Sequence, residues 1–88
     1  MKVYVTTHAL TRGIEEWSGV KEPEPDTPGM IANGKDGFDR RYAHGEGKQW
    51  HRTREGAVRR AYDIQQAKIK ALERQIAKIN AMRFEILD

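Results

Sequence analysis

Two hydrophobic patterns divide the chain near residue 53. Before it, β-branched and polar residues alternate over short stretches such as residues 3–8; after it, apolar residues recur three and four positions apart in an unbroken run. Period two is typical of half-buried strands, and the second spacing is typical of an amphipathic helix. We therefore expect an α+β protein: a small antiparallel β-sheet or barrel-like head, followed by one long C-terminal amphipathic helix.

Turn-forming residues set the limits of the expected strands. Gly13 offers the positive φ that a short hairpin turn needs. Three prolines within residues 18–29 remove backbone donors, which predicts an extended, solvated loop. Residues 33–37 and 44–47 are further glycine-rich turns. The strands expected between these turns are residues 2–8, 14–17, 30–32, 38–43 and 48–51.

Thr53 is the predicted N-cap of the helix, because its hydroxyl can accept a hydrogen bond from a first-turn amide. Glu55 suits the positive end of the helix, whereas Gly56 stands where a capping box has Glu or Gln. No proline or glycine follows, so the helix is expected over residues 54–84. About 30 helical residues measure about 45 Å, against about 25 Å for a head of about 50 residues, so the helix should overhang the head.

Apolar residues repeat along this helix in heptads that Gln65 and Arg83 interrupt. The pattern suits two parallel helices, with Lys68 and Glu73 spaced for one interchain pair. Exposed to water, each side chain would forgo about 1.5–3 kcal/mol, so we expect a cover. The cover is the chain's own sheet, a second copy in a coiled-coil homodimer, or a foreign partner. The residues of this predicted interface are Val58, Tyr62, Ile69, Leu72, Ile76 and Ile79.

Composition narrows the classes of function. The 88 residues allow one domain, with residues 1–52 as the head and 53–88 as helix and tail. The absence of cysteine excludes disulfides, thiolate nucleophiles and thiolate metal sites. No apolar run approaches the about 20 residues of a membrane span, and no signal-peptide pattern is present. A cytoplasmic protein without a membrane partner is therefore expected.

The formal net charge of +3 lies in the C-terminal third of the chain. Lys70, Arg74 and Lys78 recur every four residues and form one row, roughly opposite the heptad stripe. Such a row is typical of a solvated face, but it also suits phosphates or an acidic protein surface. Arginine pairs add guanidinium groups that could join it if the fold brings them together. The basic contact candidates are Arg40, Arg41, Arg59, Arg60, Lys70, Arg74 and Lys78.

Little in the sequence points to catalysis or to a cofactor. Trp50 and Tyr42 could stack on bases, but a tryptophan at a strand end usually fills the core, as we also expect for Trp17. The three histidines have no metal-ligand spacing with a carboxylate. No nucleophile has a base at a defined spacing, and so short a chain leaves little room for a closed pocket. We expect no metal, no other cofactor and no enzyme activity.

Two segments carry a resemblance. Residues 3–14 (VYVTTHALTRGI) and 50–57 (WHRTREGA), with a helix that ends near residues 82–84 (MRF), resemble small phage and prophage proteins without an assigned activity. Gly56 departs from the glutamate that is more usual there. The resemblance implies a phage accessory protein in the host cytoplasm, and anti-CRISPR and other defence inhibitors are one class of such proteins.

These features predict a non-catalytic protein that binds and blocks a host protein or nucleoprotein complex. The alternative is a small DNA- or RNA-binding module that uses the basic helix face. The two functions differ in the contact surface, which is the apolar stripe in the first and the basic row in the second.

Overall fold

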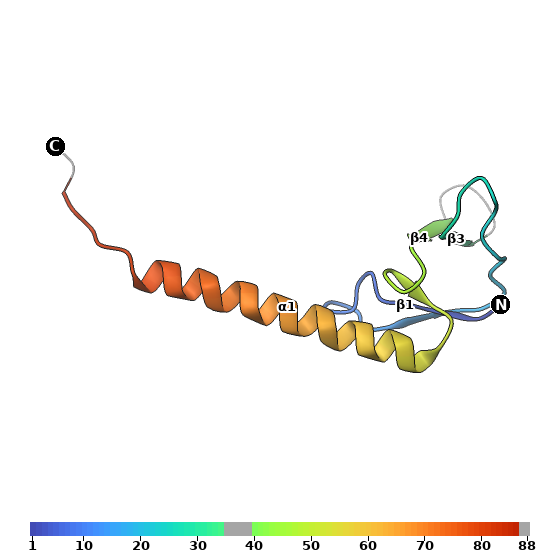
Figure 1. Cartoon of the computed structure of the whole chain (residues 1–88), viewed down its shortest axis with the longest axis horizontal. Helices are drawn as coiled ribbons and strands as arrows, with labels where there is room; N and C mark the ends of the chain where they lie inside the picture. Colours follow the sequence, from blue (N-terminus) through green and yellow to red (C-terminus); the bar gives the residue numbers. More distant parts are fainter. Residues whose placement is uncertain (35–39, 87–88) are drawn as a thin grey trace.

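The structure is a computed structural model that describes residues 1–34 and 40–86 (Figure 1). Residues 35–37 of the expected turn, and residues 38 and 39 of the expected fourth strand, lie outside this part. The described elements are β1 (Val3–Val5), β2 (Glu15–Trp17), β3 (Met30–Asn33), β4 (Arg41–His44), β5 (Trp50–His51) and α1 (Arg54–Asn80).

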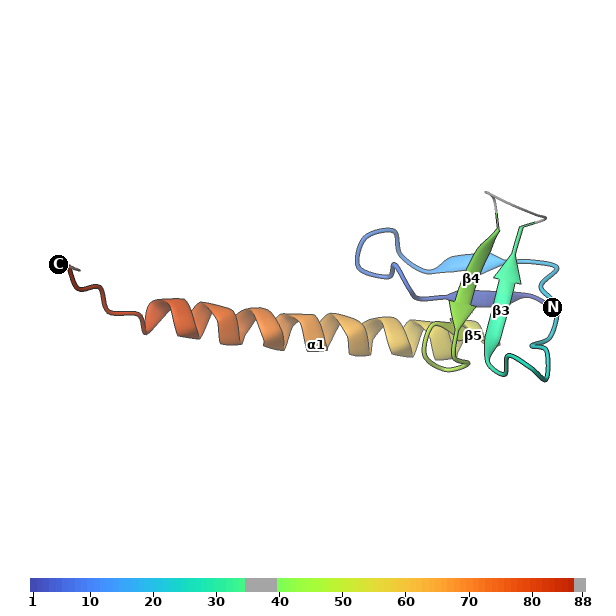
Figure 2. The same ribbon diagram turned by 90° about the horizontal axis from the view of Figure 1, so that it is seen from above.

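The strands form two antiparallel sheets rather than one barrel-like sheet. In the three-stranded sheet β1 lies between β2 and β5, and in the two-stranded sheet β3 pairs with β4. The β3–β4 pair and the start of α1 lie on opposite sides of the three-stranded sheet (Figures 1 and 2). The α+β class, with a strand-rich head and one long C-terminal helix, is confirmed.

The hydrophobic core combines side chains from both sheets. Alternate residues of β1 point into it, and Trp17 and Trp50 fill it as expected, with 3% and 0% of their surfaces exposed. The indole N–H of Trp50 donates to the Gly29 carbonyl at 2.7 Å, which links β5 to the loop before β3. The buried apolar cluster consists of Val3, Val5, Trp17, Val20, Ile31, Ala43 and Trp50.

The first and last strands are shorter than the alternating pattern predicted. β1 ends at Val5, after which the Thr6 N–H donates to the Gln49 carbonyl at 2.9 Å and the Thr6 hydroxyl to the Lys48 carbonyl at 3.1 Å. The chain then turns, with the Arg12 N–H donating to the His8 carbonyl at 2.8 Å. From residue 7 onward, this turn replaces the ladder that was expected to continue to residue 8. Lys48 and Gln49 likewise precede β5 in a turn.

The proline-rich stretch is less solvated than predicted. Val20 is buried in the core and exchanges two hydrogen bonds with Met1: its N–H donates to the Met1 carbonyl at 2.9 Å, and the Met1 ammonium donates to its carbonyl at 2.7 Å. Val20 is the only valine, leucine or isoleucine between Trp17 and Gly29. Burying it therefore anchors the loop, while most of residues 21–28 stay exposed.

Helix α1 begins at the predicted cap. Thr53 has an extended backbone, and its hydroxyl accepts the Gly56 N–H at 3.1 Å. Ala57, one turn further, is fully buried where α1 packs on β1 and β5. The capping and the first helical contacts thus position the helix on the face of the sheet opposite β3–β4.

Beyond its first turns α1 leaves the head, as its length predicted (Figure 1). Its 27 residues span about 40 Å at about 1.5 Å per residue, and the whole molecule measures 61 × 31 × 23 Å. The helix ends at Asn80 and not at residue 84. The Met82 N–H donates to the Ile79 carbonyl at 3.2 Å, which is the tighter spacing found where helices end.

We expect Trp50 to be the most sensitive core position. Trp50→Phe removes the bond to Gly29 and part of the buried ring, and should lower the free energy of unfolding by about 1–3 kcal/mol. Trp50→Ala should lower it by about 3–5 kcal/mol, most of the stability of a small domain. Equilibrium urea unfolding measures both, with Tyr42→Phe on the same head as the control. A Trp50→Phe protein as stable as the parent would refute this account of the core.

Candidate protein-binding site

Six apolar side chains follow one side of α1, and all of them are exposed. The exposed fraction ranges from 37% at Val58 to 64% at Ile79. Because each helical residue advances about 100° around the axis, their spacing keeps them in one narrow sector. We call this set the apolar stripe: Val58, Tyr62, Ile69, Leu72, Ile76 and Ile79.

The head contacts a different side of α1. Ala57 is buried, and Ala61 and Ile64 are half-buried, so these positions face the head. Counting about 100° per residue, the apolar stripe is rotated from them by roughly 90° around the helix axis. The chain's own sheet therefore does not cover the stripe, and that alternative from the sequence is wrong. The reason is both this rotation and the overhang of the helix.

A groove of about 360 Å³ lies at the head end of the apolar stripe. One wall is the β1–β2 connection, which turns at Gly13 with a positive φ of 84°, and which carries Leu10, 50% exposed. The other wall is the start of α1. We call it the head groove; its lining is Ala9, Leu10, Gly13, Ile14, Val58, Ala61, Tyr62 and Gln65.

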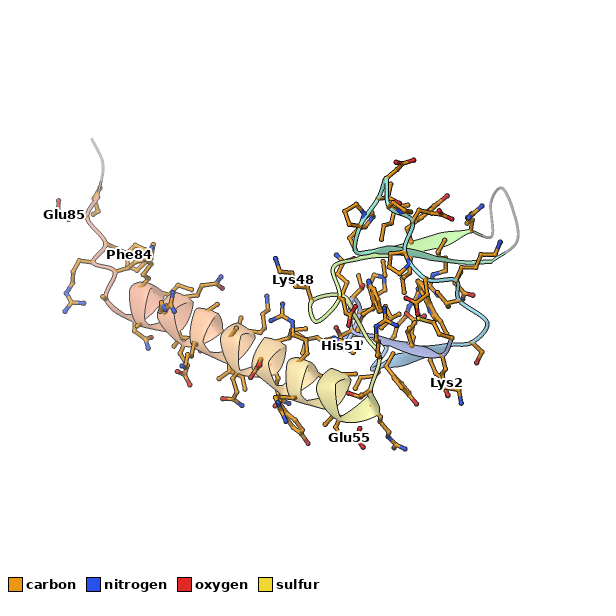
Figure 3. All side chains as sticks on the ribbon, turned by 45° about the vertical axis from the view of Figure 1, so that its right-hand side comes forward. Lys2, Lys48, His51, Glu55, Phe84 and Glu85 are labelled. Atoms are coloured by element: carbon orange, nitrogen blue, oxygen red, sulfur yellow. The ribbon has the colours of Figure 1, made fainter. Side chains whose placement is uncertain are left out.

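Apolar side chains are also exposed beyond the far end of α1. Met82, Phe84 and Ile86 are 56%, 89% and 95% exposed. Figure 3 shows Phe84 and Glu85 past the end of the helix, on the side of the molecule away from the head. We call residues 82–86 the tail. Sequence reasoning missed both the groove and the tail; an isolated leucine in a turn and a phenylalanine after the last heptad were the only signals.

The basic row of the helix is exposed, as its spacing suggested. Lys70, Arg74 and Lys78 are all solvent-accessible, and about 100° per residue places them on the side of α1 opposite the apolar stripe. Arg59 and Arg60 are exposed near the start of the helix. No ion pair joins these five side chains to an acidic residue within residues 1–34 and 40–86.

The arginine pair at residues 40–41 belongs to the other side of the head. The Arg41 guanidinium donates to both carboxylate oxygens of Glu15, at 2.7 and 3.0 Å, and lies over the Trp17 ring. This hydrogen-bonded pairing lowers the pKa of Glu15 and offsets the charge of Arg41. Arg40 lies 5.7 Å from the centre of the Tyr42 ring. The arginine pairs at 40–41 and 59–60 therefore lie in different layers and do not form one basic patch.

Arg52 makes an ion-pair network that the sequence did not predict. Its guanidinium donates to Glu22 at 2.7 and 2.8 Å and to Glu46 at 3.1 Å, and it lies over the Trp50 ring. The hydrogen bonds to these carboxylates raise the pKa of Arg52, and the same contact lowers the pKa of Glu22. All three side chains are exposed, so the network contributes little to stability. Its place is over the core tryptophan, which indicates a structural role.

His51 belongs to β5, and its side chain lies close to Gly56 at the start of α1 (Figure 3). It is 5% exposed, and its Nε2 is 3.1 Å from the Thr6 hydroxyl. Burial, and then the positive charge of Arg60, lower the pKa of His51. Nowhere in the described ranges do three His, Asp or Glu side chains gather as they would around a metal ion. The geometry is that of a neutral core histidine.

We expect acid to destabilise the protein through His51. The unfolded chain binds the proton more readily than the folded one, so this contribution to stability is complete above about pH 6.5 and is lost as the pH falls toward the lower pKa of the folded state. Urea unfolding as a function of pH should show this slope, and His51→Gln, which keeps a polar atom near Thr6, should flatten it. His8→Gln, at an exposed position, is the control. An unchanged slope in His51→Gln would show that another group is responsible.

Comparison with protein-family models, curated proteins and solved structures gives no match for this chain. Within the part of the chain that the structure describes, no helix combines the length and the apolar character needed to cross a membrane. The candidate site is therefore argued from the geometry of this chain alone. Its components are the apolar stripe, the head groove, the tail and the basic row.

Proposed function

We propose that this protein is a non-catalytic binding protein that uses the apolar stripe to contact a second polypeptide chain. The supporting observation is the exposure of Ile69, Leu72 and Ile76 on the part of α1 that projects beyond the head. A continuous apolar surface of this kind is typical of a protein interaction site, because covering it removes unfavourable contact with water. Heptad spacing suits a helical partner, whose side chains would fit between those of the stripe.

The biological role that we propose is to occupy a surface of a host protein or nucleoprotein complex and so block it. Support comes from the resemblance of residues 3–14 and 50–57 to small phage and prophage proteins. An inhibitor of host defence, such as an anti-CRISPR protein acting in the host cytoplasm, is the specific form of this proposal. Blocking by occupation requires an exposed contact surface and no active site, which matches a molecule whose distinctive feature is a projecting helix.

The alternative, a nucleic-acid-binding module, depends on the basic row Lys70, Arg74 and Lys78. Its support is weaker, since Arg41 is paired with Glu15 and the two arginine pairs lie in different layers. A net charge of +3 is also modest for a protein that tracks a phosphate backbone. Salt separates the two functions. Binding through six to eight phosphates should weaken by about a thousandfold between about 50 and 200 mM salt, whereas apolar contacts change far less.

The combined change Leu72→Lys with Ile76→Lys tests the apolar stripe. These side chains make no part of the buried core, so the variant should keep the head fold and its unfolding transition. Association with a second chain should weaken by at least on the order of a hundredfold, because two unpaired ammonium groups would enter the contact. Light scattering measures the mass in solution, and affinity capture from a host lysate measures a foreign partner.

The matched control is Lys70→Gln with Arg74→Gln, which changes two neighbouring residues on the opposite side of the same helix. We expect this protein to associate as the parent does. If the control loses association and the stripe variant keeps it, the contact surface is the basic row and the proposal is wrong. Retention by both variants would also exclude the apolar stripe.

A further inference from the structure

The head groove and the tail are complementary in character, yet they lie at opposite ends of α1. From Tyr62 to Ala81 the helix measures about 28 Å at about 1.5 Å per residue. Three residues of extended chain, from Ala81 to Phe84, reach back at most about 10 Å. The Phe84 side chain of one copy therefore cannot enter its own head groove. A tail that fills the head groove must therefore belong to a second molecule.

We infer that two copies pair through their apolar stripes in antiparallel orientation, and that the tail of each copy lies in the head groove of the other. This inference rests on the proposed function, since it names the partner that the stripe contacts. The contact is isologous, because the same surfaces are used on both copies. Each groove lies in line with the stripe, so groove and stripe form one surface for the second chain, which is apolar except at Gln65.

One antiparallel register places apolar residues of one helix opposite apolar residues of the other. When Leu72 of one copy lies opposite Ile76 of the other, Ile69 lies opposite Ile79. Every apolar position between Ile69 and Ile79 thereby contacts an apolar position, and the pairing has two-fold symmetry.

The same register delivers the tail to the groove. With Leu72 opposite Ile76, the end of the second helix at Asn80 lies at the level of Lys68 of the first. An extended tail then advances about 3.3 Å per residue while the facing helix advances about 1.5 Å. Ala81 still has a helical backbone, so the three extended residues from Ala81 to Phe84 carry Phe84 about 10 Å further, close to the level of Ala61, which lines the head groove. Phe84 and Ile86, which are the most exposed large apolar side chains among the described residues, are covered in this way.

A parallel pair, which the isoleucine and leucine pattern alone suits, leaves these surfaces uncovered. In register, it places both tails together at the far end and both heads side by side. The head groove of each copy then receives no tail, and Phe84 of one copy lies next to Phe84 of the other. The groove and the tail, which the heptad pattern does not reveal, are the reason for preferring the antiparallel arrangement.

Engineered cysteines can distinguish the two orientations, because the natural chain has none. We propose to mix Leu10→Cys protein with Phe84→Cys protein, oxidise the mixture and resolve the products on a non-reducing gel. Both positions are exposed, at 50% and 89%, so the fold should be retained. The antiparallel pair predicts a crosslinked dimer in the mixture and little crosslinking of either protein alone. Crosslinking of Phe84→Cys protein with itself would establish the parallel pair and overturn the inference.

The charge of Glu73 gives a second test with opposite signs for the two orientations. The antiparallel register brings Glu73 of one copy near Glu73 of the other, so Glu73→Gln should strengthen association severalfold. In the parallel pair Glu73 faces Lys68, so the same change should weaken association. Sedimentation equilibrium of the parent and of Glu73→Gln, at matched protein concentrations and low salt, measures the direction of the shift.

Sedimentation of the unmodified protein keeps this inference separate from the proposed function. With rising concentration the mass should increase from 10.1 kDa to twice that value. A protein that stays at 10.1 kDa at every concentration overturns the inference. The proposed function is then decided independently, because a foreign partner captured by the parent and lost by Leu72→Lys with Ile76→Lys would still support it.

Discussion

Helix α1 is longer than the head from which it starts, and this difference in size decides which surfaces are free. The head contacts only the first part of α1, where β1 and β5 lie against its first turns around Ala57 and the β1–β2 connection lies beside Ala61 and Tyr62. From Ile69 to Asn80 every residue of the helix except Ala71 is exposed in the single chain. A row of isoleucine and leucine in that position is unfavourable in water, which is why we propose that a second chain covers this part of the helix.

Features that depend on neighbouring residues were predicted from the sequence. Thr53 caps the helix because its hydroxyl and the Gly56 amide are three residues apart. The apolar stripe follows from heptad spacing alone, and Trp50 fills the core because a large ring at a strand end has few other places to go. Strand lengths were not predictable in this way. β1 stops at Val5 because the chain turns over residues 7–12, with the Arg12 N–H bonded to the His8 carbonyl, and alternation in residues 3–8 does not show this turn.

The candidate site was predicted only in part, because some of its features depend on neighbouring residues and others on tertiary contacts. Sequence spacing located the stripe and the basic row, since both lie on one helix. Whether the arginines at 40–41 and 59–60 join depends on tertiary structure, which separates them into different layers and pairs Arg41 with Glu15. The head groove also forms only when the β1–β2 connection is brought against α1. The groove also changes the orientation that we propose for the pair, because it offers a binding place for the tail, which lies outside the heptad repeat.

Hydrogen exchange of the backbone amides between Ile69 and Ile79 tests the central claim most directly. If a second copy covers the apolar stripe, these amides should exchange slowly at high protein concentration and faster on dilution, while the amides of β1 stay protected throughout. Fast exchange from Ile69 to Ile79 at every concentration, in a protein whose head is fully folded, would contradict the account.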